Sequence, residues 1–505
     1  MSLQSALLTA RSGLLYTQRA LATASDNVAN ADTVGYTRKT VGAAAIESSG
    51  VRALPTSRDV DEALVTELNS RRAAAAGAAL RSDLLSGIEA AHGSTESGDG
   101  IGDLVAALHT GFEELRATPS EAGLQGATVV AAQDLAGRLN EVSGVIADAR
   151  QRAQDTVVDE VSAINAGLRD IAGLTLRIKE QIALTGDAAA LEDARDAAIA
   201  TLSSSIEVKA LKREDGGLVL VARNGLVLPL DPWSDAFATS DAALDATSFH
   251  GSGGSIPGIT MGGQDVTATL LGGRLAEAVA LRDQTLPRYQ AELDLTAATL
   301  AARFDAQGLT LFTDAVGAVP DTAGAYAGSA MVGFAGRIRV NAAVTADPSL
   351  LRDGTRAVTG DPSGSADFTP NPAGGPASFT GLLDRVVDFS FGAEARAGIA
   401  WSAIATGGLG PDGTLSSPFN APATLEGYAA MVTATQTADS AAAEARSTGA
   451  KAIVTGLEER FARRSGVDVD GEMAAMVTLQ NAYAANARVM STVQAMWDTL
   501  LNAVR

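Results

Sequence analysis

Both ends of the chain have apolar residues in a repeating pattern of four and three steps. This spacing is a heptad repeat, which places one narrow apolar stripe along an α-helix. At the N-terminal end the stripe consists of Leu3, Leu7, Ala10, Leu14, Thr17, Leu21, Ala24 and Val28. At the C-terminal end it consists of Met476, Leu479, Tyr483, Asn486, Met490, Val493, Trp497, Leu500 and Val504. The pattern predicts two amphipathic helices, which either pair with each other or pack separately on a globular core.

The charge distribution favours pairing of the two ends. The 505 residues include 59 acidic and 38 basic side chains, for a net charge of −21. The first forty residues contain four basic and two acidic side chains, and the last forty contain two and four. Ends of low charge on an acidic body indicate that the ends are buried while the body faces water. The acidic charge argues against binding to nucleic acid or to an anionic membrane.

Four stretches between the ends have apolar residues at helical spacing: 61–115, 135–182, 274–306 and 425–461. The first is interrupted by a polar, glycine-containing segment after His92. The second would span about 70 Å as one unbroken helix. Because these stretches come from early, middle and late parts of the chain, we predict one discontinuous helical domain.

Two further stretches have the character of β inserts. Residues 201–268 contain short apolar runs around a Gly-Gly and an Asn-Gly dipeptide, which are typical of hairpins. Residues 310–420 are rich in glycine, proline, serine and aspartate, and the apolar runs 338–340 and 386–391 fit strands between long loops. We expect both inserts to provide much of the acidic surface and to make few contacts with the helical domain.

The predicted fold is therefore a multidomain α+β protein. It combines terminal helices that pair as a coiled coil, a discontinuous long-helix domain, and mostly β inserted domains. The predicted domains are a terminal coiled-coil domain (1–35 with 470–505), a helical domain (36–200 with 269–309 and 421–469), a small β insert (201–268) and a β-rich insert (310–420).

The sequence offers no site for catalysis, cofactor binding or metal binding. There is no cysteine, and His92, His109 and His250 form no spaced pair of metal ligands. Asp468 to Glu472 resembles a calcium loop, but its Gly and Glu stand at the wrong positions, and helix capping explains the aspartates better. We therefore predict a protein that is not an enzyme and has no cofactor.

A short motif follows the first predicted helix. Asn27, Asn30, Thr33, Gly35, Tyr36 and Arg38 stand in a segment that ends a helix and turns the chain. The segment resembles the N-terminal signature of the bacterial flagellar axial proteins. It departs from that signature mildly, with Asp26 and Asp32 in place of asparagine and Val28 in place of isoleucine.

Three further stretches resemble the hook-associated protein 1 family, whose members form the hook–filament junction. They are the C-terminal run 465–489, the segment Leu191 to Asp196, and the internal stretch Gly272 to Pro287. Gly471 departs from the family, which usually has an acidic residue there, and the departure predicts a weaker start of the last helix.

The resemblance implies a structural subunit of the bacterial flagellum that joins hook to filament. It implies type III export without a cleaved signal peptide, then assembly through the terminal helices on the extracellular flagellum. The implied partners are other copies of the chain, the hook protein, the second hook–filament junction protein and a cytosolic export chaperone at the C-terminal helix. Alternatives are another axial subunit, such as hook or filament protein, and an axial protein with a hydrolase domain in 310–420.

Overall fold

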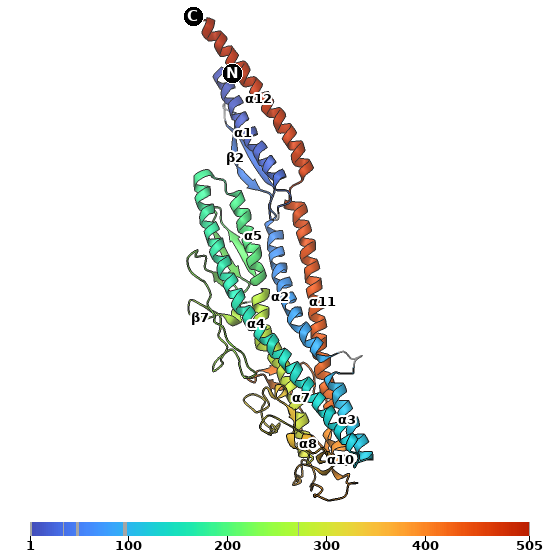
Figure 1. Cartoon of the computed structure of the whole chain (residues 1–505). Coiled ribbons are helices and arrows are strands. Elements are labelled where there is room, and N and C mark those ends of the chain that lie inside the picture. The colour runs from blue at the N-terminus through green and yellow to red at the C-terminus, as the bar shows by residue number, and fades with distance from the viewer. Residues whose placement is uncertain (1–2, 34, 47–49, 94–97, 271, 504–505) are drawn as a thin grey trace.

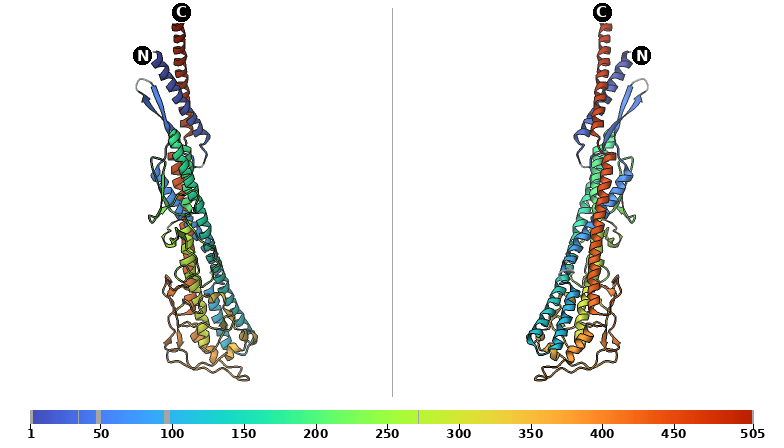
Figure 2. Two further views of the ribbon diagram at one scale, coloured as in Figure 1. Left: turned by 90° about the vertical axis from the view of Figure 1, so that its left-hand side faces the viewer. Right: turned by 90° about the vertical axis from the view of Figure 1, so that its right-hand side faces the viewer.

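The computed structural model describes residues 3–33, 35–46, 50–93, 98–270 and 272–503. They form an elongated body of long helices, and a narrower rod that contains both chain ends extends from one end of it (Figure 1). The same tapered outline is visible from both sides (Figure 2). The predicted class, a multidomain α+β protein with long helices and small antiparallel sheets, is confirmed.

The helices and strands follow in chain order. The α-helices are α1 (Leu3–Ala29), α2 (Glu62–His92), α3 (Ile101–Ala117), α4 (Ala122–Thr185), α5 (Ala189–Ser205), α6 (Gly273–Ala280), α7 (Leu286–Ala306), α8 (Ala342–Ala346), α9 (Leu350–Asp353), α10 (Gly381–Arg385), α11 (Leu425–Ser465) and α12 (Val469–Ala503). The antiparallel pairs are β1 (Lys39–Ile46) with β2 (Gly50–Arg58), β6 (Thr260–Met261) with β7 (Gln264–Asp265), β8 (Phe312–Thr313) with β9 (Arg339–Val340), β10 (Glu394–Arg396) with β11 (Ile399–Ala400), and β12 (Gly407–Leu409) with β13 (Leu415–Ser416). A three-stranded sheet consists of β3 (Val208–Lys212), β4 (Leu218–Ala222) and β5 (Val227–Leu228).

The long helices of the body form around buried aliphatic stripes. The 64 residues of α4 span about 96 Å at 1.5 Å per residue. This helix is longer than predicted and continues through Gly144 and Gly173, where a side chain would meet nothing within 4 Å. On its buried face Leu139, Val142 and Ile164 are fully enclosed. Helix α2 lies beside both α4 and α11, so segments far apart in sequence share one core, as predicted (Figure 1).

The run Val386 to Phe391 is not the strand that we predicted. Residues Val386–Ser390 form a π-helical turn, η4, which continues α10. Leu382 and Leu383 in α10 and Val386 and Val387 in η4 are all buried, which is the four-residue spacing of one helix face. A short apolar run does not distinguish a strand from a buried helical turn.

The insert 310–420 packs into the body, so the expectation of few contacts with the helical domain is wrong. Phe391 lies against Phe304 of α7 and Phe112 of α3, with ring centroids 5.3 and 6.3 Å apart. Most of the insert is loop, and buried arginines hold the loop carbonyls in place. The Arg303 guanidinium, for example, donates to the carbonyls of Gly392 and Ala423, each at 2.9 Å. The sparse strands are therefore supplemented by charge-assisted hydrogen bonds to the backbone.

Asp294 in α7 makes a buried polar contact between body and insert. Its carboxylate is fully buried and accepts hydrogen bonds from Tyr326 Oη, Gly333 N and Ala335 N at 2.7 to 2.8 Å. Burial raises the pKa of Asp294 to about 6, although these hydrogen bonds favour the ionised form. The insert is thus attached through an acid that costs free energy to ionise in the folded protein.

We expect a pH dependence of stability from Asp294. Because its pKa is higher in the folded chain than the unfolded value of about 3.9, stability should fall as pH rises from about 4 to 6, by roughly 2 kcal/mol. Denaturant unfolding at pH 4.5 and 6.5 measures this change in the free energy of unfolding. The fluorescence of the insert serves as the signal. Asp294→Asn should remove this pH dependence. If the unfolding free energy of the variant still falls with pH as before, other groups cause the fall.

Candidate functional site: the paired chain ends and their joint

The two chain ends form an antiparallel helix pair, called here the terminal pair, from α1 and α12 (Figure 1). The helices approach closely because α1 has small residues on its inner face. A Cβ atom added to Gly13 would lie 2.9 Å from Asn486 Nδ2 of α12. Ala10, Thr17 and Ala24 are buried beside it.

The predicted N-terminal seam lies along this inner side. Leu14 is only 8% exposed. Leu3, Leu7, Leu21 and Val28 are half-buried. The predicted seam therefore includes the buried centre of α1. Within the seam, the small residues are less exposed than the leucines.

The predicted C-terminal seam is covered only in part. Val493 is 5% exposed, and Met476, Leu479 and Met490 are half-buried. Tyr483, Trp497 and Leu500 are 44, 38 and 51% exposed, and Val504 lies outside the described residues. Helix α12 extends past the start of α1 (Figure 1), so α1 does not cover its last turns. Tyr483 is instead at the edge of the buried stripe, beside the smaller, half-buried Ala482.

A hairpin that we did not predict contacts α1 beside the terminal pair. Strands β1 and β2 are anchored by Tyr16, whose hydroxyl donates to the Val41 carbonyl at 3.5 Å, and by Ser12, whose Oγ accepts from Val51 N at 3.1 Å. A polar Glu-Ser-Ser-Gly segment between two stretches containing β-branched residues was the available sequence signal. Helix α1 is therefore held by both the hairpin and α12.

The predicted turn motif joins α1 to β1. Asn27 is fully buried, and its side chain donates to the Lys39 carbonyl at 2.8 Å and accepts from Lys39 N at 3.1 Å. Tyr36 donates to Asn27 Oδ1 at 3.0 Å, and Lys39 Nζ lies 3.3 Å from the Tyr36 ring centroid. Burial, together with nearby carboxylates, raises the pKa of Tyr36 to about 12, so its phenol stays protonated and donates.

The other motif residues complete the turn. Asn30 Nδ2 donates to the Asp26 carbonyl at 2.9 Å, and Thr33 N donates to the Asn30 carbonyl at 2.9 Å. Gly35 has φ of +81°, a conformation that other residues rarely adopt, which explains a glycine there. The motif therefore fixes the direction in which the chain leaves α1.

We expect Asn27→Ala to destabilise this turn. The substitution leaves a buried Lys39 N–H and carbonyl without partners, at a cost of about 2 kcal/mol. Hydrogen exchange of β1 measures the loss, which should appear as faster exchange near Lys39. Asn30→Ala, at a more exposed position of the same motif, is the matched control and should change the exchange little.

Below the turn, buried ion pairs connect the terminal pair to the body. We call this cluster the joint; it comprises Thr37, Arg38, Lys39, Arg58, Glu192, Asp193, Asp196 and Glu472. Asp193 at its centre accepts from Thr37 Oγ1 and Lys39 Nζ, both at 2.6 Å, and from Arg58 Nη1 at 2.9 Å.

Arg58 connects three carboxylates of α5. It also donates to Glu192 at 3.0 Å and Asp196 at 2.8 Å. Burial disfavours its charge, but the neighbouring carboxylates, Asp196 foremost, raise the pKa of Arg58 above its usual value. These charges compensate one another in a site with little solvent.

Arg38 extends the joint to the last helix. Its Nε donates to the buried Glu472 of α12 at 2.7 Å, and its backbone N–H donates to the Ser465 carbonyl at the end of α11 at 2.9 Å. The turn motif, the Leu191 to Asp196 segment and the C-terminal run therefore meet at one place. Sequence reasoning identified each of these segments but not their contact.

The outer surface of the terminal pair has many exposed apolar side chains. In addition to Tyr483, Trp497 and Leu500, large exposed side chains on α1 and α12 are Leu8, Leu15, Met473, Val477, Val489, Met496 and Leu501, each 45–60% exposed. Exposed apolar surface of this extent on a small helix pair is typical of a protein–protein contact surface.

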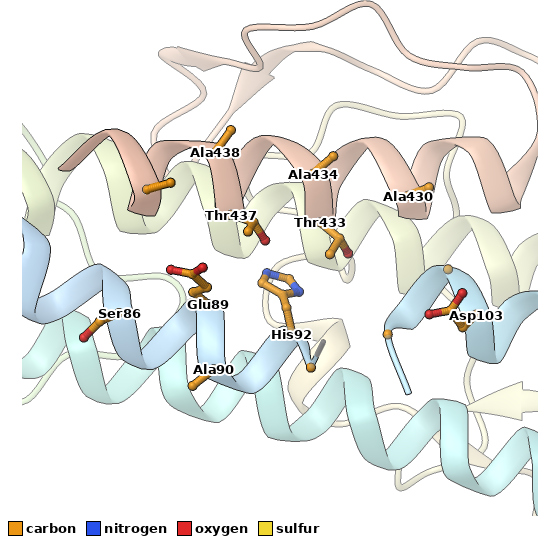
Figure 3. A pocket seen from close by; sticks show the side chains of 14 residues that line it. Ser86, Glu89, Ala90, His92, Asp103, Ala430, Thr433, Ala434, Thr437 and Ala438 are labelled. Atoms are coloured by element: carbon orange, nitrogen blue, oxygen red, sulfur yellow. The ribbon is translucent and has the colours of Figure 1, made fainter. Parts of the chain in front are cut away.

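A groove of about 1030 Å³ lies in the body between α2, the start of α3 and α11 (Figure 3). Ala430, Ala434 and Ala438 line one wall, and His92 points into it from the end of α2. His92 Nε2 hydrogen-bonds Gln436 Oε1 at 2.8 Å, and burial lowers the pKa of His92. No group of three potential metal-ligating side chains occurs among the described residues. In the same residues, no helix has the length and apolarity that a membrane crossing requires.

Comparisons with known proteins place the chain among flagellar proteins. Residues 85–317 match the family described as flagellar hook-associated protein FlgK helical domain. Residues 7–37 match the family of flagella basal body rod proteins, and residues 459–503 match the C-terminal family of the flagellar basal body rod FlgEFG proteins. The ends thus match families named for rod proteins, whereas the helical body matches a hook-associated protein.

A full-length relative agrees with these matches, and a solved structure is similar over part of its length. The chain is 22% identical to flagellar hook-associated protein 1 of Escherichia coli strain K12 over an alignment of 547 residues, which covers 98% of each protein. It is also similar to the flagellar hook junction protein FlgK of Burkholderia pseudomallei, with 23% identity and a TM-score of 0.41 over 49% of this chain and 46% of that one. The matched part is thus about half the length of that solved structure. Along its helical body, and over its full length in the alignment with the relative, the chain is therefore similar to the FlgK family of flagellar hook-associated proteins.

Proposed function

We propose that the chain is a structural subunit that joins hook to filament and assembles through its terminal pair. The observation that carries this proposal is the apolar outer surface of α1 and α12, which is left uncovered in the single chain. Burying the exposed half of one such side chain contributes roughly 1 kcal/mol, so association that covers several of them is favourable. Similarity to flagellar hook-associated proteins supports the extracellular flagellum as the setting.

The partners follow from the same surface. Copies of the chain, the hook protein and the second hook–filament junction protein would contact the terminal pair in the assembled axis. Before export, a cytosolic chaperone would cover the C-terminal helix, where Trp497, Leu500 and Leu501 are exposed. We propose type III export for this route. The family is structural, and we propose that the chain has no catalytic activity.

Electron microscopy of a strain without the chain tests the function. Hooks should be present, filaments absent, and filament protein should leak into the medium. Expression of the chain should restore filaments. Normal filaments in the deletion strain would contradict a junction role, and missing hooks would indicate a different axial subunit.

A further inference from the structure

Trp233 is the most exposed tryptophan of the chain, at 84%, and its loop is held in place. Asp231 Oδ1 accepts from Trp233 N at 3.0 Å, and Asp231 Oδ2 accepts from Ser234 Oγ at 2.7 Å. Asp235 then forms an ion pair with Arg169 of α4. The loop therefore presents the indole ring to solvent with little freedom to withdraw it.

A surface hollow of about 470 Å³ lies beside this loop. Val227, Pro229 and Met261 form its apolar part, and Asp231 and Asp235 provide carboxylates. The exposed indole ring of Trp233 stands on the loop that borders this hollow, although it does not line the hollow itself. An aromatic face near carboxylates suits a guanidinium group, which can stack on the ring while a carboxylate balances its charge. The chemistry of this hollow, called here the Trp233 hollow, therefore fits an arginine side chain.

The second half of α11 offers such an arginine. Residues 444–465 contain five basic and three acidic side chains, in a protein whose net charge is −21. Arg446 is exposed and has no ion-pair partner among the described residues. Its neighbours on the same face are small: Ala442, Gly449 and Ala450. A side chain at Gly449 would meet nothing within 4 Å, so another surface can approach Arg446 closely.

The two surfaces lie on different flanks of the elongated body. Figure 1 shows α11 along one flank and β7 along the other, and the adjacent strand β6 contributes Met261 to the Trp233 hollow. A contact between unlike surfaces of identical chains is heterologous, and it repeats around a ring or a helix. A single chain cannot bring these two surfaces together, but neighbouring copies can.

We propose that copies of the chain contact one another side by side in this way, with Arg446 of one copy stacked on Trp233 of the next. The proposal rests on the proposed function, in which copies associate, and it names the body surfaces that meet. Charge complementarity supports this choice of partner: Asp231 leaves a negative charge at the hollow beyond the Asp235–Arg169 ion pair, and the second half of α11 is a basic segment of an acidic protein.

Crosslinking between singly substituted copies tests the contact, because the chain has no cysteine. One copy has Val227→Cys at the hollow and the other has Gly449→Cys, one turn from Arg446. With both copies assembled on flagella, a short bismaleimide reagent should yield a covalent dimer. Val316→Cys, an 87% exposed position in the other insert, combined with Gly449→Cys is the matched control and should yield none.

Second substitutions identify the side chains responsible. Trp233→Ala or Arg446→Glu in these copies should reduce the dimer yield by at least about tenfold, as expected for loss of an interface anchor. Trp233→Phe, which keeps an aromatic face, should retain most of it. An undiminished yield with both disruptive variants would overturn the proposal, and so would the absence of the dimer on flagella with restored filaments. Failure of the unsubstituted chain to restore filaments would instead contradict the proposed function. In that case, crosslinking of the same cysteine variants in concentrated purified protein would test the contact between copies independently of flagella.

Discussion

Asp193→Ala should detach the terminal pair from the body without unfolding the body. Asp193 is the shared acceptor of Lys39, Arg58 and Thr37. Both cationic side chains are more than nine-tenths buried, so removing the carboxylate leaves uncompensated charge in a nearly dry site. Breaking a buried ion pair from one side costs about 3–5 kcal/mol.

Limited proteolysis with circular dichroism measures this effect. Cleavage near the turn motif should become rapid, while most of the helical signal and its melting remain. Glu192→Ala is the matched control, because Glu192 binds the same arginine from a more exposed position and should matter little. A double-mutant cycle of Asp193→Ala with Lys39→Met isolates the energy of the Asp193–Lys39 ion pair. A coupling energy near zero would show that the joint does not attach the terminal pair to the body.

Leu14→Asp should separate α1 from α12 in the single chain. Leu14 is 8% exposed and therefore already packed in the single chain. The substitution loses roughly 1.5–3 kcal/mol of apolar burial and adds several more for an unpaired buried carboxylate. We therefore expect a separate, low-temperature loss of helical signal from the ends, and loss of motility in cells.

Leu15→Asp is the neighbouring control for that experiment. Leu15 is 59% exposed on the outer surface of the pair, so the purified chain should melt as the unsubstituted chain does. If the outer surface is the assembly surface, cells with Leu15→Asp should nevertheless lose filaments. Equal melting of both variants would show that α1 does not pack on α12 in the free protein.

Local patterns predicted the elements well and their contacts less well. Heptad spacing predicted α1 and α12, and the glycine-containing dipeptides predicted the turns of the β3–β5 sheet, because both signals depend on neighbours in sequence. The joint could not be predicted in this way, since Asp193 and Lys39 are more than 150 residues apart and no periodicity connects them. How much of the C-terminal seam is covered depends on how far α1 extends along α12. Because α1 is the shorter partner at that end, Trp497 and Leu500 remain uncovered.

The antiparallel terminal pair has a consequence for the order of folding. Its two helices are the first and the last segments of the chain, so contacts between Gly13 and Asn486 close a loop of more than four hundred residues. Such a closure is entropically unfavourable unless the intervening chain is already compact. The pair must therefore form last, on a body that has brought both ends to the same place. A nascent or partly threaded chain cannot display the assembly surface, and only a completed subunit is competent to add to the growing structure.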